Sequence, residues 1–180
     1  MRNLSDAEII DSILKGNPVD FNLLIDKYKH RAFSMLKRML KNQMDAEEVL
    51  QDSFLKAYYG LKNFRKESKF STWFYSIVYH SALSRLSNRR EQYQKQMESL
   101  EDNFEVESLK TDFETNDYSN LHDMITKLPA KYASVVNLFY LEEMSCEEIA
   151  EIMKTSVSNV KVLLHRSRNY LREISKGKGV

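Results

Sequence analysis

The sequence is poor in the residues that form turns, disulfides and membrane spans. Its 180 residues include 4 Gly, 2 Pro and a single Cys. One cysteine excludes an internal disulfide framework and is usual in a reducing compartment. There is no run of about 18 consecutive apolar residues, and the N-terminal residues lack the apolar segment of a signal peptide. We therefore expect a cytoplasmic protein with no membrane insertion.

The sequence also lacks the elements of a catalytic or metal site. Its 4 Gly are not grouped into a phosphate-binding loop, and its 4 His are dispersed, without the His/Cys spacing of a zinc site. Cys146 stands at the start of a predicted helix, where packing or capping is its expected role. The adjacent acids Glu142 and Glu143 are interpreted as a solvated helix surface rather than an acid–base pair. We expect a protein that is not an enzyme and needs no metal or cofactor.

What the sequence does contain is helical periodicity over most of its length. Apolar residues recur every three or four positions in two groups of segments, whereas strand-like alternation is nowhere sustained. A chain of this length holds one or two small domains. We predict an all-α protein with two small helical domains, at residues 1–90 and 121–175.

Charge is distributed unevenly, although the formal net charge is only +1. Residues 62–90 and 154–178 each carry seven basic residues against one acidic residue, whereas residues 91–123 carry ten acidic residues and two Lys. The acidic segment has scattered apolar residues without a firm period, so it cannot bury a core of its own. We predict that residues 91–120 form a flexible acidic linker between two domains with basic, anion-facing surfaces.

The C-terminal segment has the pattern of a helix-turn-helix. Ser145 is suited to cap a first helix, and Glu148, three residues later, completes a capping box. The periodicity breaks at residues 154–156, and a second, basic helix follows with Ser156 or Ser158 as its cap. Such a pair of helices places the second one in a DNA major groove. A helical hairpin with a solvated basic surface is the alternative for this segment alone.

In the first domain a basic loop leads into an aromatic helix. Residues 64–90 interleave aromatic side chains with Arg and Lys, a combination that can neutralise phosphates and hold unstacked bases. Core packing accounts for most of the aromatic residues, but not for the basic loop or the terminal arginines. The preceding helix is expected to begin with Asp45 as its cap and to present an acidic surface. That surface fits either a solvated helix or a basic protein partner.

Together these segments resemble the extracytoplasmic-function group of bacterial RNA polymerase sigma factors over almost the whole chain. In the first domain the similarity lies in Asp45–Phe54 and Phe64–Trp73. In the second domain it lies in Leu128-Pro129, Glu147–Ala150 and His165–Arg168. The resemblance implies a specificity subunit that binds core RNA polymerase and promoter DNA and is restrained by an anti-sigma factor.

The resemblance also implies a role for each surface, with residues 1–90 similar to sigma region 2 and residues 121–175 similar to region 4. One helix of the first domain is similar to the segment that docks on the clamp of the largest polymerase subunit, through Asp45, Glu48, Gln51 and Asp52. The basic loop and the helix after it are similar to the segment that binds the promoter −10 element, through Arg65, Lys66, Ser68, Lys69, Ser71, Thr72, Trp73, His80, Arg85, Arg89 and Arg90. The second helix of the helix-turn-helix is similar to the recognition helix for the −35 element, through Ser156, Ser158, Asn159, Lys161, Val162, His165 and Arg166.

The chain departs from the family pattern at several positions. His80 and Ser84 stand where Asn and Asp are common, and Val162 and Leu163 replace two polar residues on or beside the DNA-facing side of the recognition helix. We therefore expect an altered −35 preference. Two other classes of protein stay open. One is a helix-turn-helix regulator that binds duplex DNA without polymerase, and the other is an interaction protein that mimics a sigma factor.

Overall fold

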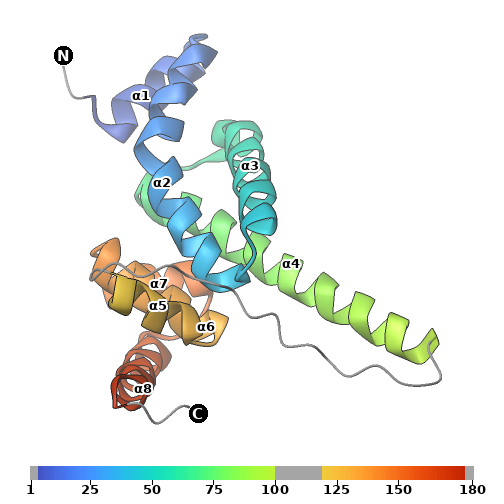
Figure 1. Cartoon of the computed structure of the whole chain (residues 1–180). Coiled ribbons are helices and arrows are strands. Elements are labelled where there is room, and N and C mark those ends of the chain that lie inside the picture. The colour runs from blue at the N-terminus through green and yellow to red at the C-terminus, as the bar shows by residue number, and fades with distance from the viewer. Residues whose placement is uncertain (1–3, 100–118, 177–180) are drawn as a thin grey trace.

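The computed structural model describes residues 4–99 and 119–176, and all regular structure in these ranges is helical (Figure 1). The first domain contains α1 (Asp6–Leu14), α2 (Phe21–Leu40), α3 (Gln43–Gly60) and α4 (Phe70–Ser99), with short 3-10 turns at Pro18–Asp20 and Leu61–Asn63. The second contains α5 (Ser119–Lys127), α6 (Ala130–Val136), α7 (Cys146–Met153) and α8 (Val157–Ser175), with a π-helical segment at Asn137–Leu141. The prediction of an all-α protein with two helical domains is confirmed.

The predicted linker is only partly within the described residues. Helix α4 continues through Ser99, beyond the expected end at Arg90, and α5 begins at Ser119. The rest of the predicted linker, residues 100–118, lies outside the described residues, so its expected flexibility stays a prediction.

Helix α3 begins earlier than the sequence pattern indicated. The Asn42 side chain accepts a hydrogen bond from the backbone N–H of Asp45 at 2.9 Å, so Asn42 is the cap and the prediction of an Asp45 cap is wrong. An Asn side chain is as good a cap as Asp, and here it lies one helical turn earlier. The Asp45 carboxylate is therefore available for contacts with another helix.

The core of the first domain is a group of stacked and edge-on aromatic rings. The Phe74 ring is fully buried, and its centroid lies 4.8 Å from that of Phe54 and 5.6 Å from that of Tyr28. These rings come from α4, α3 and α2, so they hold the three long helices together. Helix α4 starts at Phe70, whose ring is buried in this core.

The helix-turn-helix forms as predicted. Ser145 and Glu148 make a capping box at the start of α7, and Ser156 caps α8 by accepting from the N–H of Asn159 at 3.2 Å. Between the helices Lys154 has a φ of 50°, the left-handed conformation that ends α7. Leu163 is buried with the inward side of α8, which corrects its expected place on or beside the DNA-facing side.

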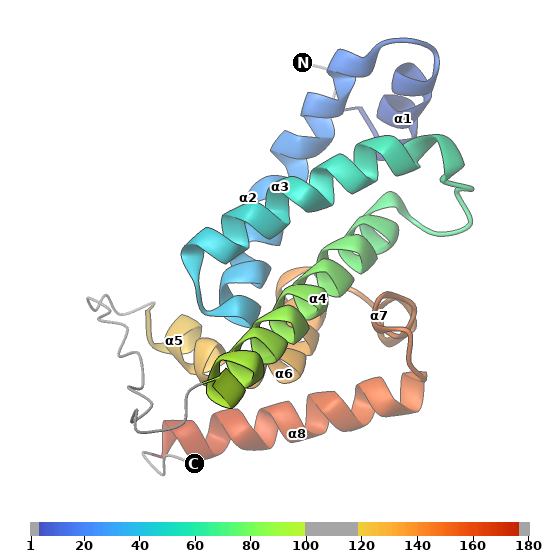
Figure 2. The same cartoon turned by 90° about the vertical axis from the view of Figure 1, so that its right-hand side faces the viewer.

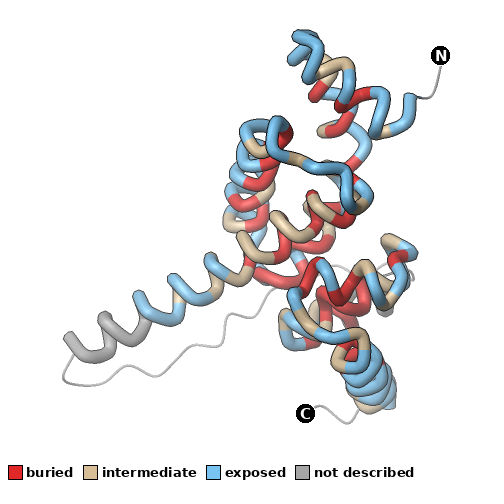
Figure 3. The backbone as a smooth tube through the Cα atoms, turned by 180° about the vertical axis from the view of Figure 1, so that it is seen from behind, coloured by how far each residue is buried: buried red, intermediate tan, exposed pale blue. Residues whose placement is uncertain are grey.

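The two domains pack against each other. Helix α6 lies against α2, and α7 lies beside α4 (Figure 2). Buried residues continue from the first domain into the second as one hydrophobic cluster (Figure 3). No helix in the described ranges has the length and apolar character needed to cross a membrane.

Candidate nucleic-acid and polymerase interfaces

The exposed side of α8 carries most of the residues predicted to bind the −35 element. Of the predicted residues, those that are exposed are Ser156, Ser158, Lys161, Val162, His165 and Arg166. Asn159 is half-buried, and its side-chain N–H donates to the Thr155 hydroxyl at 2.8 Å, so it also ties the turn to α8. This side of α8 combines two cations, an imidazole and two hydroxyls around one apolar side chain, Val162.

The basic loop before α4 presents cations that differ in their freedom. Arg65 is the most open, with 82% of its side chain exposed and a 4.0 Å contact to Glu67. Lys66 reaches back to Asp11 of α1 at 2.5 Å, which lowers the pKa of that carboxyl group. Lys69 pairs across the domain boundary with Glu148 at 2.9 Å. The loop is therefore partly neutralised within the molecule.

Two of the residues predicted to bind the −10 element lie inside the first domain. Thr72 is 1% exposed. The Trp73 ring packs against Phe64, with 4.9 Å between centroids, and lies within 3.1 Å of the position a Cβ would take at Gly60. These side chains shape the loop from behind, whereas Ser68 and Ser71 are half-buried and Arg90 is exposed.

The four residues of α3 predicted to bind polymerase fall into two groups. Asp45 and Glu48 pair with arginines of α4, whereas Gln51 and Asp52 are exposed. Arg85 lies 2.5 Å from a Glu48 oxygen and 3.4 Å from an Asp45 oxygen, and Arg89 lies 2.9 Å from the other Asp45 oxygen. The structure thus joins two of the residues predicted to bind polymerase to two of those predicted to bind DNA.

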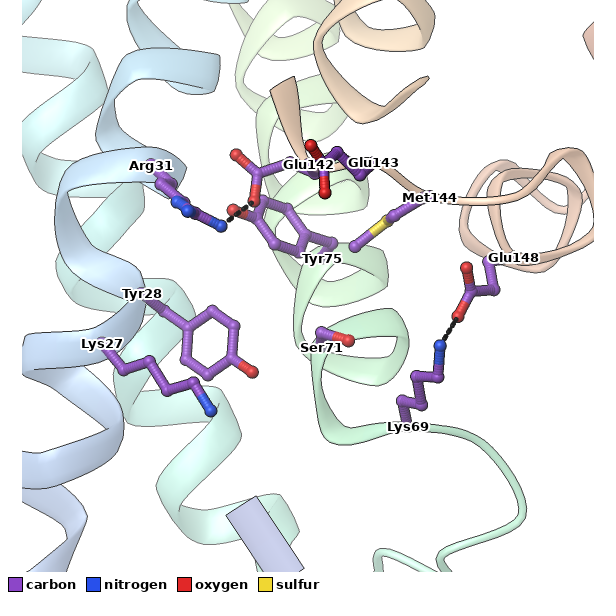
Figure 4. Close-up of a pocket in the computed structure, with 10 residues that line it drawn as sticks. All are labelled: Lys27, Tyr28, Arg31, Lys69, Ser71, Tyr75, Glu142, Glu143, Met144 and Glu148. Carbon is purple, nitrogen blue, oxygen red and sulfur yellow. Dashed lines mark ion pairs between the residues drawn. The ribbon is translucent and has the colours of Figure 1, made fainter. Parts of the chain in front are cut away.

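A polar cleft of about 350 Å³ separates the two domains where α2 and α4 meet the segment after α6 (Figure 4). Glu142 points into it, with only 5% of its side chain exposed, and lies 3.8 Å from Arg31. Burial raises the pKa of Glu142, while the Tyr75 hydroxyl and the guanidinium groups of Arg31 and Arg38 oppose that rise. The carboxylate is thus held at the boundary by groups of the first domain.

Helix α7 covers part of the surface predicted to bind the −10 element. His80 Nε2 lies 3.1 Å from the backbone carbonyl oxygen of Ile152. Because a carbonyl oxygen can only accept, Nε2 must carry the hydrogen in this contact. Burial lowers the pKa of His80, so at neutral pH the ring is favoured in its neutral form, with its single N–H at Nε2. With the Lys69–Glu148 pair, this contact places the second domain over one side of α4.

Sequence patterns did not reveal the domain boundary. The interpretation of Glu142 as a solvated helix residue is wrong, because its carboxylate is enclosed by α2 and α4, whereas Glu143 is exposed as expected. Arg38 and Asn137, both buried, hydrogen-bond across the boundary at 2.5 Å. One indication of this boundary is present in the sequence: Arg38 and Asn137 are each a polar residue within an otherwise apolar stripe of a helix.

Comparison with known protein families gives two matches along the chain. The model of sigma-70 region 2 matches residues 24–92, and the model of sigma-70 region 4 matches residues 118–171. Together they cover both groups of helices.

Individual proteins are similar to almost the whole chain. The ECF RNA polymerase sigma factor SigW of Bacillus subtilis is 31% identical over 91% of this chain and 93% of its own length. The ECF RNA polymerase sigma-E factor of Escherichia coli K12 is 30% identical over 92% of this chain and 91% of its own length.

Solved structures share the fold. The sigma factor RpoE, in a complex with the anti-sigma factor NepR from Bartonella quintana, aligns with a TM-score of 0.71 and 19% identity over 87% of this chain and 97% of that one. CnrH, in a complex with the cytosolic domain of CnrY, aligns with a TM-score of 0.68 and 18% identity over 95% and 97%. Both sigma-70 regions are present, and the similarity to ECF sigma factors extends over almost the whole chain. The chain therefore belongs to the ECF family of RNA polymerase sigma factors.

Proposed function

We propose that this sigma factor acts in the cytoplasm and docks on the clamp of core RNA polymerase through the exposed side of α3. The observation that supports docking there is that Gln51 and Asp52 are exposed and that Asp52 has no ion pair among the described contacts. Glu48 lies one helical turn before Asp52 on the same side of α3 and is 60% exposed, although it also pairs with Arg85. A surface of this charge suits a basic protein segment and disfavours DNA.

We further propose that the two domains divide the promoter between them. The first binds the −10 element through the basic loop and α4, and the second binds the −35 element through α8. The exposed side of α8 is available as it stands, whereas Lys69 and His80 are engaged by α7. Binding to polymerase therefore has to separate the domains before the −10 surface is complete, and it then fixes both at one promoter.

An anti-sigma factor is the third partner that we propose. The solved structures of RpoE and CnrH are complexes with NepR and with the cytosolic domain of CnrY. A protein that stabilised the packed arrangement would keep the −10 surface covered, because a ligand shifts a conformational equilibrium toward the state that it binds better.

Run-off transcription tests the proposed function. Core polymerase supplemented with this protein should produce transcripts from some members of a promoter library, and core polymerase alone should not. Transcripts that require the protein would support a sigma factor with its own promoter preference. If no promoter responds while the protein binds duplex DNA without polymerase, the role in initiation is wrong.

Replacement of Gln51 and Asp52 by alanine should weaken binding to core polymerase about tenfold or more, the scale of losing one or two good interface contacts. The fold should persist because both side chains are exposed. Titration of fluorescently labelled protein with core polymerase measures the change. The matched control is Asn22→Ala with Asp26→Ala, which removes one amide and one acid from an exposed side of α2. Equal affinities of the two double variants would count against docking through α3.

A further inference from the structure

The ion pairs between α3 and α4 form one charge-balanced network. Arg85 is placed between the carboxylates of Asp45 and Glu48, and Asp45 is shared with Arg89. Two guanidinium groups therefore face two carboxylates. As long as the network is intact, neither arginine presents a net positive charge to a phosphate.

The four side chains differ in how easily a partner can reach them. Asp45 is the most enclosed, with 18% of its side chain exposed, and Arg85 and Arg89 are 26% and 31% exposed. Glu48 is 60% exposed. It is therefore the one member that a docking protein can engage without taking the helices apart.

Both arginines line a groove between α3 and α4. The groove has a volume of about 340 Å³, and its lining includes Lys56, Ser84 and Asn88 in addition to Arg85 and Arg89. Three cations and several neutral hydrogen-bond donors at one groove suit a backbone phosphate. Asp52 also lines the groove, and Asp45 and Glu48 balance the two arginines, so three carboxylates offset the three cations until one of these acids is engaged elsewhere.

We propose that Glu48 couples polymerase binding to DNA binding: when a basic segment of the polymerase engages Glu48, Arg85 is released to bind a nucleic-acid phosphate in the α3–α4 groove. The inference rests on the proposed function and adds a mechanism to it. Asp45 then keeps Arg89 and Arg85 positioned along α4. Because linkage is reciprocal, a phosphate on Arg85 must also free Glu48 for the polymerase.

The first arm of the test uses the free full-length chain and a labelled oligo-dT single strand. Glu48→Gln should raise its affinity about threefold, the scale of a solvent-exposed ion pair. The same substitution should make the slope of the logarithm of the binding constant against the logarithm of salt concentration steeper by about 0.7, the value for one additional phosphate contact on a single strand. Glu47→Gln is the matched control, because it removes the same charge from α3 and its only described side-chain bond is to Gln43. In an Arg85→Gln background, Glu48→Gln and Glu47→Gln should have the same effect.

The second arm measures binding to core polymerase without DNA. Arg85→Gln should raise the affinity about threefold by freeing Glu48, whereas Arg90→Gln, which changes an exposed arginine on the same helix, should not. The coupling is wrong if Glu48→Gln behaves like Glu47→Gln and Arg85→Gln behaves like Arg90→Gln while the unaltered chain binds core polymerase. In that case the proposed function stands. If the unaltered chain does not bind core polymerase at all, both are overturned.

Discussion

Replacing Glu142 with lysine is expected to separate the two domains of the free protein. The Glu142 carboxylate is 5% exposed and faces Arg31, so a lysine there places like charges together inside the boundary. Arg31 is 68% exposed, so the buried charge is the lysine itself, and an uncompensated charge in a buried position costs about 3–5 kcal/mol. A cost of about 3 kcal/mol lowers the ratio of packed to separated molecules more than a hundredfold. Small-angle X-ray scattering should record the change as an increased radius of gyration.

Glu143→Lys is the control for this experiment. Glu143 is the next residue, is exposed, and has no ion pair among the described contacts. The Glu143→Lys substitution changes the net charge by the same amount as Glu142→Lys but should leave the radius of gyration unaltered. Circular dichroism should show equal helix content for both variants, which separates domain opening from unfolding. An unchanged radius for Glu142→Lys, or equal expansion of the two variants, would contradict the role of Glu142 in closure.

Phe74→Ala should cause the largest loss of stability in the first domain. Its ring is fully buried and contacts aromatic rings of α2, α3 and α4, including Phe54 at 4.8 Å and Phe70 at 5.9 Å between centroids. Truncating such a ring removes transfer free energy and leaves a cavity, at a cost of about 3–5 kcal/mol. Urea unfolding followed by tryptophan fluorescence measures it, because the single tryptophan, Trp73, packs beside Phe70 and reports on this domain.

Tyr59→Ala provides the comparison for Phe74→Ala. Tyr59 is an aromatic residue of the same domain but is 68% exposed. Its loss should change the free energy of unfolding by no more than about 0.5 kcal/mol, as is usual for surface positions. A Phe74→Ala cost as small as this would mean that the aromatic core repacks around the gap.

Local sequence patterns predicted the parts of the fold that depend on local chemistry. The capping box at Ser145–Glu148 is signalled by residues three positions apart, and it forms as predicted. The errors arose where two local solutions competed. Asn42 and Asp45 can each cap a helix, and the sequence does not show that Asp45 has arginine partners 40 and 44 positions later.

The domain boundary could not be predicted because it depends on residues that are distant in sequence. Arg38 and Asn137 are 99 positions apart, and each alone is an ordinary polar residue in a helical segment. Glu142 follows a helix, where acids are usually solvated, and only the approach of α2 and α4 encloses it. For the same reason the residue pattern located the proposed DNA-binding surfaces but not the cover that α7 places over one of them.

The side chain of Glu148 uses its two oxygens for two separate tasks. Oε2 accepts from the backbone N–H of Ser145 at 2.9 Å and completes the first turn of α7, while Oε1 receives Lys69 of the other domain. When Lys69 withdraws, the first turn keeps its own hydrogen bonds. The first turn of α7 therefore does not depend on the contact with the other domain, and breaking the Lys69–Glu148 pair does not by itself require that the helix melt.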